Sequence, residues 1–375
     1  MSAQHLPRRV LLTADAVGGV SVYAMELARV LSQREVEVVL AVLGPRLSPA
    51  QAAEAASLPG VTLEETGLPL DWMAASREVL DWTAAALAGL AREYRVELVQ
   101  LHSPAWAASS RWPAPVIAVT HSCVGTWWRA MHGAAPPPED FAWRMAAVRA
   151  GLLAADTVIA PTQAFADLTR KVYGLHRPIA VVHNARSAAA FPPAGVRRGI
   201  LAAGRLWDGA KNIATLDAAA AMLPGIPVAA AGPVHGPHGV AVSLGAITAL
   251  GALDAPSMAA FMASARIFAS PSVYEPFGLA VLEAAQAGLP LVLADIPGFR
   301  ELWEGAATFL PPTEPGAWAK TLRELHARPR ECQKRGLRAR ERAAQYGIGQ
   351  FAASMCQHYR RTLVTSGLRL ERVAP

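Results

Sequence analysis

Short apolar runs alternate along the chain with longer segments in which apolar residues recur every three or four positions. The short runs are rich in Val, Ile and Leu, which is typical of strands, and the longer ones are rich in alanine, which favours helix. In the first half of the chain we expect strands at 8–14, 35–42, 96–102, 114–121, 156–162 and 178–184. The expected helices of this half cover 19–33, 72–94, 139–154 and 162–174.

This alternation is interrupted once, between residues 184 and 198, by a stretch rich in alanine and proline. It then restarts with expected strands at 199–206, 226–232, 246–251, 266–271, 289–295 and 307–312. Strands that alternate with helices are typical of parallel sheets covered on both faces. We therefore expect an α/β protein with domains at 1–184 and 185–347. For the last helical segment, 348–375, one option is that it packs back on the N-terminal domain.

Composition narrows the class of protein. No apolar run reaches the roughly 18 residues of a membrane-spanning helix, and Asp15 interrupts the apolar start of the chain too early for a signal peptide. We expect a cytoplasmic protein and leave open a peripheral contact at the inner face of the membrane. The net charge of +6 favours anionic ligands. Because no nucleic-acid-binding motif is present, we expect small phosphorylated ligands rather than nucleic acid.

Two glutamates in the segment SVYEPFGLAVLEAAQAG flank the expected start of a helix near Phe277 or Gly278. Glu275 precedes this start, and Glu283 lies about one and a half turns into the helix. The first amides of a helix have no partner within it and are suited to phosphate, whereas carboxylates are suited to sugar or ribose hydroxyls. The pattern alone also fits an alternative in which Glu275 is an acidic residue at a helix N-terminus, Glu283 is exposed or salt-bridged, and the two share no ligand.

Three further segments place polar groups directly after expected strands, where open parallel sheets bind their ligands. In GILAAGRLWDGAKN, Arg205 and Lys211 could neutralise a diphosphate, although surface cations are the alternative. Gly18 and Gly19 separate the first strand from the first helix, without the spacing of a dinucleotide-binding loop. His121 also follows a strand, as does His102, and such a histidine is structural about as often as it is catalytic.

Together these motifs resemble those of retaining nucleotide-sugar glycosyltransferases of family 4. The resemblance covers nearly the whole chain and is most specific in EPFGLAVLEAAQAGLPLVLADIPGFREL, followed by GRLWDGAKN and the GGV turn. It implies the GT-B architecture, in which two Rossmann-like domains face each other across a cleft. It also implies that Arg205 and Lys211 bind the donor diphosphate, that Glu275 contacts the transferred sugar, and that Glu283 contacts the ribose hydroxyls.

The resemblance extends to backbone groups and to the first domain. It implies that the amides at Phe277, Gly278 and Leu279 contact the sugar or phosphate. Gly19, in the turn with Gly18, would meet the diphosphate, and His121 would lie near the reacting carbon. Two segments depart from the family pattern. VVHNARS lacks the Gly and the acidic residue that commonly follow Asn184, and AGPVHGPHG replaces a short glycine turn, which puts the base-binding side in doubt.

Neither a cofactor nor a metal ion is implied. The chain has no Asp-x-Asp motif to hold a divalent ion on a diphosphate, and His235 and His238 lack a nearby third ligand. Cys123 lies two residues after His121, but a thiol without an orienting partner is more often a packing residue. The chain has three cysteines, Cys123, Cys332 and Cys356, and their spacing fits neither a metal site nor a disulfide framework.

Some alternatives stay open. The segment 125–151, with its tryptophans and arginines, fits an acceptor site or membrane interface, and it equally fits a helix hairpin whose tryptophans belong to the core. The acceptor is a saccharide, a lipid-linked molecule or a small molecule. The predicted activity is metal-independent glycosyl transfer with retention. A glycoside phosphorylase or hydrolase on the same scaffold, or a non-catalytic nucleotide-sugar-binding module, is the alternative.

Overall fold

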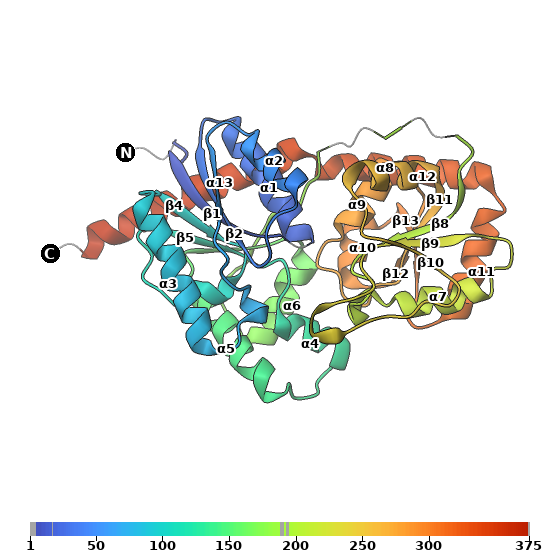
Figure 1. Ribbon diagram of the computed structural model, residues 1–375, viewed down its shortest axis with the longest axis horizontal. Helices are drawn as coiled ribbons and strands as arrows, with labels where there is room; N and C mark the ends of the chain where they lie inside the picture. Colours follow the sequence, from blue (N-terminus) through green and yellow to red (C-terminus); the bar gives the residue numbers. More distant parts are fainter. Residues whose placement is uncertain (1–4, 17, 188–190, 193–194, 374–375) are drawn as a thin grey trace. The chain divides into compact units, whose positions relative to one another are not determined.

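The computed structural model describes residues 5–16, 18–187, 191–192 and 195–373, and the chain forms two compact units (Figure 1). Unit 1 comprises Met1–Ala185 together with Ile348–Pro375, and unit 2 comprises Arg186–Gly347. The interrupted segment near residue 184, where the alternation of strands and helices pauses, is therefore also where one unit gives way to the next.

Within the described residues, unit 1 contains a seven-stranded parallel sheet with the order β3-β2-β1-β4-β5-β6-β7. Its strands are β1 (Arg9–Asp15), β2 (Glu37–Leu43), β3 (Val61–Glu65), β4 (Leu98–Leu101), β5 (Val116–Val119), β6 (Thr157–Ala160) and β7 (Ala180–Val181). Its helices before the linker are α1 (Gly19–Ser32), α2 (Pro49–Ala56), α3 (Arg77–Glu93), α4 (Val124–His132), α5 (Glu139–Ala154) and α6 (Gln163–Tyr173), with short 3₁₀ turns η1 (Asp71–Met73) and η2 (Pro104–Trp106). The central strands are buried, which explains their continuous apolar runs.

The last helix, α13 (Ile348–Val373), completes the core of unit 1. Phe351, Met355 and Tyr359 recur at helical spacing and are buried among side chains of the sheet and α1. The Tyr359 hydroxyl donates to Gln100 Oε1 at 2.7 Å, and the hydroxyls of Thr157 and Thr362 lie 2.7 Å apart. The expected return of this segment to the N-terminal domain is confirmed.

Unit 2 contains, within the described residues, a six-stranded parallel sheet with the order β10-β9-β8-β11-β12-β13. Its strands are β8 (Arg198–Ala203), β9 (Val228–Ala231), β10 (Thr248–Gly251), β11 (Ala265–Ser270), β12 (Leu291–Ala294) and β13 (Ala307–Leu310). Its helices are α7 (Ile213–Ala221), α8 (Ala255–Ser264), α9 (Leu279–Gln286), α10 (Pro297–Trp303), α11 (Pro315–His326) and α12 (Pro329–Ala343), with 3₁₀ turns η3 (Gly209–Lys211), η4 (Pro237–Gly239) and η5 (Ala344–Tyr346). Trp303 and Trp318 are fully buried in its core.

Each sheet has one switch point, where the chain leaves two neighbouring strands in opposite directions. In unit 1 this point lies between β1 and β4, and in unit 2 it lies between β8 and β11. Loops that leave a switch point diverge, and the crevice they leave at the carboxyl ends of the strands is where such sheets bind ligands. The fold therefore indicates one position in each unit at which to look for function.

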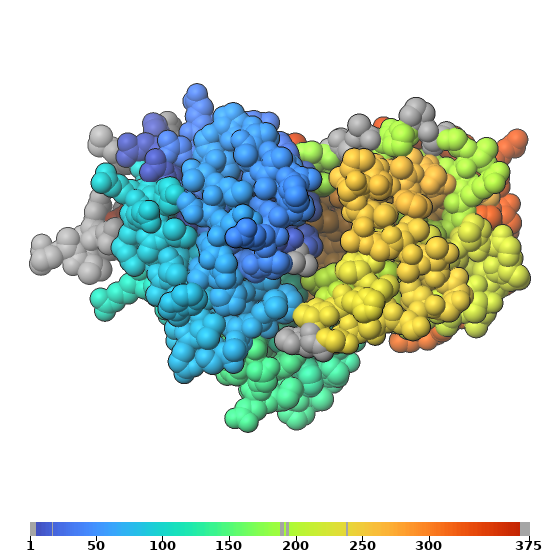
Figure 2. All heavy atoms as spheres, in the orientation of Figure 1, coloured from blue at the N-terminus to red at the C-terminus, as the bar shows by residue number. Residues whose placement is uncertain are grey.

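The Trp- and Arg-rich segment 125–151 forms a hairpin of α4 and α5, seen as the green surface at the bottom of Figure 2. The ring of Trp128 lies 4.0 Å from that of His132 and 5.3 Å from that of Phe141, and its Nε1 donates to the Ala135 carbonyl at 2.8 Å. Trp127, Trp128 and Trp143 are each partly exposed. The segment is thus a helix hairpin, but its tryptophans pack within the hairpin rather than in the core.

Candidate active site

The loop after β8 carries the first pair of cations. Gly204 has a φ of 154°, and η3 begins after a turn that Asp208 holds closed. The buried carboxylate of Asp208 accepts from the Ala210 amide at 3.0 Å and from Arg205 at 3.1 Å. Lys211 closes the short turn, and its side chain is 19% exposed. This local geometry keeps both cations beside the carboxyl end of β8.

The loop after β11 is tied to the loop after β8. The Val273 amide donates to the Ala210 carbonyl at 2.9 Å, and Asn212 Nδ2 donates to the carbonyls of Pro271 and Pro312 at 3.0 and 2.7 Å. Asn212 adopts a left-handed conformation with φ 51°, which asparagine tolerates better than most residues. The two loops that leave the switch point are therefore one connected structure.

Helix α9 begins directly after this loop. Gly278 is its N-cap residue, with φ 89°, and α9 starts at Leu279, one residue after the latest expected start. A Cβ at Gly278 would lie 3.1 Å from the Phe299 ring and 3.2 Å from Glu275 Cγ, so a side chain here would be crowded by both residues and its backbone conformation would be strained. The sequence predicted a helix start here, and α9 does begin at this point, with Gly278 buried and Leu279 partly exposed.

Glu275 and Lys211 meet across the two loops. Lys211 Nζ forms an ion pair with Glu275 Oε2 at 2.5 Å, and the Glu275 side chain is only 14% exposed. From sequence each residue was expected to contact a ligand separately. The structure brings them together, so that in this state each is the counter-charge of the other.

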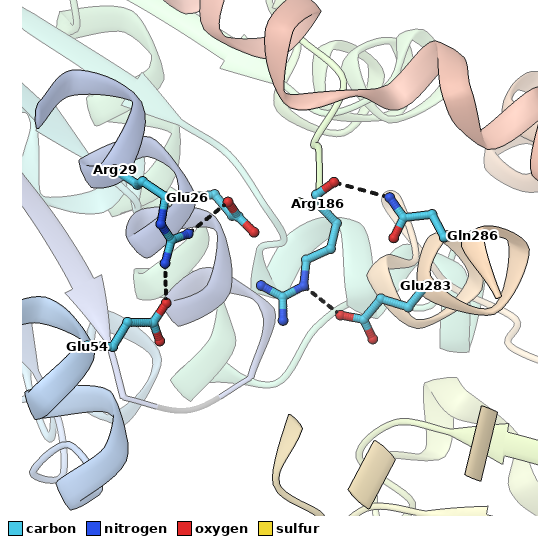
Figure 3. A network of polar contacts seen from close by, with 6 residues as sticks. All are labelled: Glu26, Arg29, Glu54, Arg186, Glu283 and Gln286. Atoms are coloured by element: carbon cyan, nitrogen blue, oxygen red, sulfur yellow. Dashed lines mark hydrogen bonds and ion pairs between the residues drawn. The ribbon is translucent and has the colours of Figure 1, made fainter. Parts of the chain in front are cut away.

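Glu283 has a different partner. Its Oε1 accepts from Arg186 Nε at 2.9 Å, and Gln286 Nε2 donates to the Arg186 carbonyl at 3.1 Å (Figure 3). Both side chains are partly buried: that of Glu283 is 20% exposed and that of Arg186 is 25% exposed. Arg186 was missed from sequence, although it lies in the segment VVHNARS, which departs from the family pattern after Asn184.

The loop after β9 folds over Trp207. The Val242 amide donates to the Val234 carbonyl at 3.0 Å, which makes the long loop a small hairpin. A Cβ at Gly236 would lie 2.4 Å from the Trp207 ring, so glycine is needed for this contact. The Arg205 guanidinium lies 5.7 Å from the centre of the same ring, at a distance compatible with a cation–π contact. The unusual loop therefore supports Trp207 and, through it, Arg205.

In unit 1 the turn between β1 and α1 has the expected glycines. Gly18 is the N-cap residue of α1 with φ 83°, and Gly19 is the first residue of the helix. A Cβ at Gly18 would meet no atom within 4 Å, so its conformation rather than its packing requires glycine. Farther along α1, Arg29 is ion-paired with Glu26 and Glu54 at 3.1 and 2.6 Å, a network also drawn in Figure 3.

His121 belongs to an aromatic cluster at the carboxyl ends of β4 and β5. Its ring centre lies 4.5 Å from that of Tyr23 and 5.0 Å from that of His102. Burial lowers the pKa of His121 to about 3, and that of His102 well below its usual value, so both imidazoles are neutral near pH 7. Among the described residues, His121 Nε2 is buried without a hydrogen-bond partner. Most buried polar atoms have a partner, so this unsatisfied nitrogen is a notable feature of the cluster.

His102 links this cluster to the last helix. Its Nε2 lies 2.9 Å from Gln100 Nε2, and Gln100 accepts from Tyr359 of α13. Since the amide nitrogen is a donor, His102 Nε2 is the acceptor, and its tautomer carries the proton on Nδ1. The backbone amide of His102 is held by Thr13 Oγ1 at 2.8 Å. His102 is therefore fixed by the core.

The remaining candidates do not form a site. The thiol of Cys123 lies 3.0 Å from the Thr126 hydroxyl and 3.2 Å from that of Tyr173, and burial raises its pKa, which disfavours a nucleophilic thiolate. His235 pairs with Ala241 through backbone in the loop hairpin, and the side chain of His238 lies outside the described part of the chain. Within the described residues no group of three side chains is placed to hold a metal ion.

Comparison with known families agrees with this geometry. A model described as Glycosyltransferase Family 4 matches residues 17–188, and one described as Glycosyl transferases group 1 matches residues 197–328. A D-inositol 3-phosphate glycosyltransferase of Kineococcus radiotolerans is 28% identical over 94% of this chain and 92% of its own length. The enzyme of the same description from Streptomyces avermitilis is 28% identical over 92% of this chain and 83% of its own.

Solved structures show the same fold. Sucrose-phosphate synthase from Thermosynechococcus elongatus aligns with a TM-score of 0.75 and 20% identity over 96% of this chain and all of that one. Anabaena HepE in complex with UDP-glucose aligns with a TM-score of 0.72 and 17% identity over 96% of this chain and all of that one. Both sheets and the family matches to both units thus lead to one conclusion. The chain is a glycosyltransferase of family 4 with the GT-B fold.

Proposed function

We propose that the protein transfers a sugar from a nucleotide-sugar donor to a hydroxyl-bearing acceptor, with retention at the anomeric carbon and without a metal ion. The observation that carries the proposal is the convergence of Arg205, Lys211, Glu275 and the start of α9 at the switch point of the unit 2 sheet. A nucleoside diphosphate needs positive charge and amide donors, and both are present there. Unit 2 would serve as the donor side and unit 1 as the acceptor side.

Charge stabilisation is the main catalytic contribution that this site can make. As the bond from the sugar to the diphosphate breaks, negative charge grows on the leaving phosphate. Arg205 and Lys211 would neutralise that charge, and the amides at Phe277, Gly278 and Leu279 would donate to it or to the sugar. Lys211 would have to divide its hydrogen bonds between Glu275 and the phosphate, which an ammonium with three donors can do.

The two glutamates would hold different parts of the donor. Glu275, in the loop before α9, would accept from hydroxyls of the transferred sugar, and Glu283, within the helix, would accept from the ribose diol. Arg186 forms an ion pair with Glu283. We propose that it stays beside the carboxylate when the donor binds and orients it toward the ribose. Each glutamate has a cation as its partner, an arrangement that suits hydrogen-bond acceptors better than the acid and nucleophile of a hydrolase.

The proposed reaction has one bond formed and one broken at the anomeric carbon. The acceptor oxygen attacks from the face that the leaving group departs from, through an oxocarbenium-like transition state. The acceptor proton passes to the departing phosphate oxygen, so that no protein base is required. In unit 1 we propose that neutral His121 hydrogen-bonds to a sugar hydroxyl through Nε2 and that the Gly18–Gly19 turn meets the diphosphate, as the family resemblance implies.

For the acceptor we propose a phosphorylated polyol or saccharide. The similar enzymes of Kineococcus and Streptomyces are described as acting on D-inositol 3-phosphate, and the net charge of +6 suits an anionic substrate. In the described part of the chain no helix is long and apolar enough to cross a bilayer. We propose a cytoplasmic setting, with contact at the inner membrane face if the acceptor is lipid-linked.

A coupled assay tests this proposal. The protein is incubated with a panel of nucleotide sugars, with and without D-inositol 3-phosphate, and the release of nucleoside diphosphate is measured together with the product's anomeric configuration by NMR. We expect acceptor-dependent release with one donor and retention in the product. Binding of a donor without release under all conditions would support a non-catalytic module instead, and release that needs only water would support a hydrolase.

A further inference from the structure

A pocket lies in unit 2 at the edge of its sheet opposite to the candidate donor site. It has a volume of about 420 Å³ and is lined by residues at or next to the amino ends of β8, β11 and β12, by the turn after α9 and by α12. In a parallel sheet the amino ends of all strands share one edge, and the candidate donor site lies beyond the other. The pocket is therefore separate from that site.

Close packing of α12 forms one wall of the pocket. A Cβ at Gly336 would lie 2.0 Å from the Gly288 carbonyl oxygen, so that only glycine lets the helix approach the turn after α9 this closely. On either side of Gly336, the helix contributes Cys332, Leu337 and Arg340 to the lining. These positions recur at helical spacing and face the same way. The position of this wall is thus fixed by the packing of α12 in the fold.

Three arginines line the pocket, and no acidic residue does within the described part of the chain. Arg197 donates to the carbonyls of Ala287 and Gly288 at 2.6 and 2.9 Å. Arg266 donates to the carbonyls of Arg197 and His326 at 3.0 and 2.9 Å. Carbonyls fix the planes of these guanidinium groups without neutralising their charge.

Arg340 differs from the other two arginines. It is exposed on α12, and within the described residues its side chain makes neither a hydrogen bond nor an ion pair. Burial lowers the pKa of Arg197, which shows that its surroundings already disfavour the cation. An anion bound in the pocket would favour the charged form of Arg197.

The rim of the pocket is apolar. Val196 is 74% exposed and Leu337 is 53% exposed, and Pro329 lies beside them in the lining. Exposed apolar residues at the mouth of a charged pocket suit a ligand with both an anionic group and an apolar part. A volume of about 420 Å³ is enough for such a small molecule and falls within the usual range of ligand sites.

We propose that this pocket binds the phosphate group of an amphiphilic phosphate ester, held by Arg197, Arg266 and Arg340, with its apolar part against Val196 and Leu337. Guanidinium groups form charge-assisted hydrogen bonds with phosphate, and the donors that Arg197 and Arg266 do not use for carbonyls remain for it, together with those of Arg340. The ester could be a free metabolite or the headgroup of a phospholipid. The shared chemistry is the phosphate, and the experiment below separates the two sources.

The test uses the full chain with Arg205→Ala and Lys211→Ala, which removes the cations of the candidate donor site. Thermal-shift titration with inorganic phosphate and sedimentation with phosphatidylcholine vesicles, with and without phosphatidic acid, are the two probes. Each is repeated after Arg340→Glu and after Arg338→Glu. Arg338 is the matched control because it is exposed on the same helix but does not line the pocket.

We expect Arg340→Glu to weaken phosphate binding about tenfold or more, since one charge-assisted contact becomes repulsive, and Arg338→Glu to change it less than about twofold. Binding to phosphatidic acid vesicles that is lost only with Arg340→Glu assigns the phosphate to a lipid. Phosphate binding without vesicle binding assigns it to a free ester. If Arg340→Glu and Arg338→Glu weaken binding equally, the ligand is attracted to the basic helix in general. If neither probe binds, the pocket is not a phosphate site. Either result would overturn the proposal.

Discussion

At the switch point of the unit 2 sheet the candidate side chains are charged and paired, whereas at that of unit 1 they are aromatic and uncharged. Lys211 and Glu275 form an ion pair beside the start of α9. In unit 1, His121 and His102 lie against Tyr23, and burial lowers the pKa of both imidazoles. The same topological position thus holds two different kinds of chemistry.

The difference follows from what each unit is proposed to do. The leaving group of a glycosyl transfer gains negative charge, and fixed positive groups stabilise that charge best when they are in place before the reaction. A sugar hydroxyl needs only a hydrogen-bond partner, for which a neutral imidazole suffices. We therefore expect substitutions in unit 2 to change catalysis steeply and substitutions in the unit 1 cluster to change it less.

The largest effect is expected from Lys211→Ala. Loss of one cation from the leaving-group site should lower kcat/KM by about 2–4 kcal/mol of transition-state stabilisation, or roughly 30- to 1,000-fold. Arg205→Ala should act in the same direction. Steady-state kinetics with the best donor measures both, and Lys320→Ala, an exposed lysine on α11, is the control. Near-normal turnover in both variants, with folding intact, would contradict the diphosphate role.

The two glutamates should separate binding from turnover. Glu275→Gln should lower kcat about tenfold or more, because its charge acts where positive charge develops on the sugar, and should leave nucleoside diphosphate affinity nearly unchanged. Glu283→Gln should instead raise the donor KM and weaken nucleoside diphosphate binding about tenfold, since it touches the ribose in the ground state. Kinetics and calorimetric titration distinguish the two. A reversed pattern would show that their positions around α9 have been assigned the wrong way round.

A smaller effect concerns pH and the unit 1 cluster. The folded pKa of His121, about 3, lies below the unfolded value near 6.5, so between these values the unfolded chain binds the extra proton. Stability should therefore fall as the pH is lowered through this window, by about 1–2 kcal/mol for His121 between pH 7 and pH 5. The side chain introduced by His121→Phe cannot titrate, so this variant should lose less stability between pH 7 and pH 5 than the wild type does. Thermal midpoints at the two pH values measure the difference, and equal losses in both proteins would mean that His121 is not buried as a neutral group.

The smallest effect should come from a chelator. If Arg205, Lys211 and the start of α9 together neutralise the diphosphate, excess EDTA should leave the transfer rate unchanged. The assay is run with and without added magnesium or manganese after EDTA treatment. Inactivation that either ion reverses would show that the cations of unit 2 are not sufficient for the proposed role.

Much of the fold was predictable because buried parallel strands have continuous apolar runs. The strand β3 was missed for a physical reason: it lies at the sheet edge, its residues are partly exposed, and it ends in Glu64 and Glu65. The short helix α2 was missed as well, since it buries only Ala55 and shows little periodicity. Elements that bury many side chains show a clear pattern of apolar residues in the sequence. Elements at the edge, such as β3 and α2, bury few side chains and do not show it.

For the candidate site, the sequence indicated where the proposed residues lie along the chain but not which partners they have. Spacing around Gly278 indicated where Glu275 and Glu283 lie along the chain. The ion pairs of Glu275 with Lys211, 64 residues away, and of Glu283 with Arg186, 97 residues away, depend on tertiary packing that no local pattern records. The pocket of Arg197, Arg266 and Arg340 escaped notice for the same reason.

The most direct test of the central claim, that the charged switch point of unit 2 binds the donor diphosphate, is calorimetric titration of nucleoside diphosphates into the wild type, Lys211→Ala and Lys320→Ala. At least one nucleoside diphosphate should bind the wild type and Lys320→Ala equally, and its affinity should fall about tenfold or more in Lys211→Ala. Equal affinity in all three proteins, or binding by none of the nucleoside diphosphates, would contradict it.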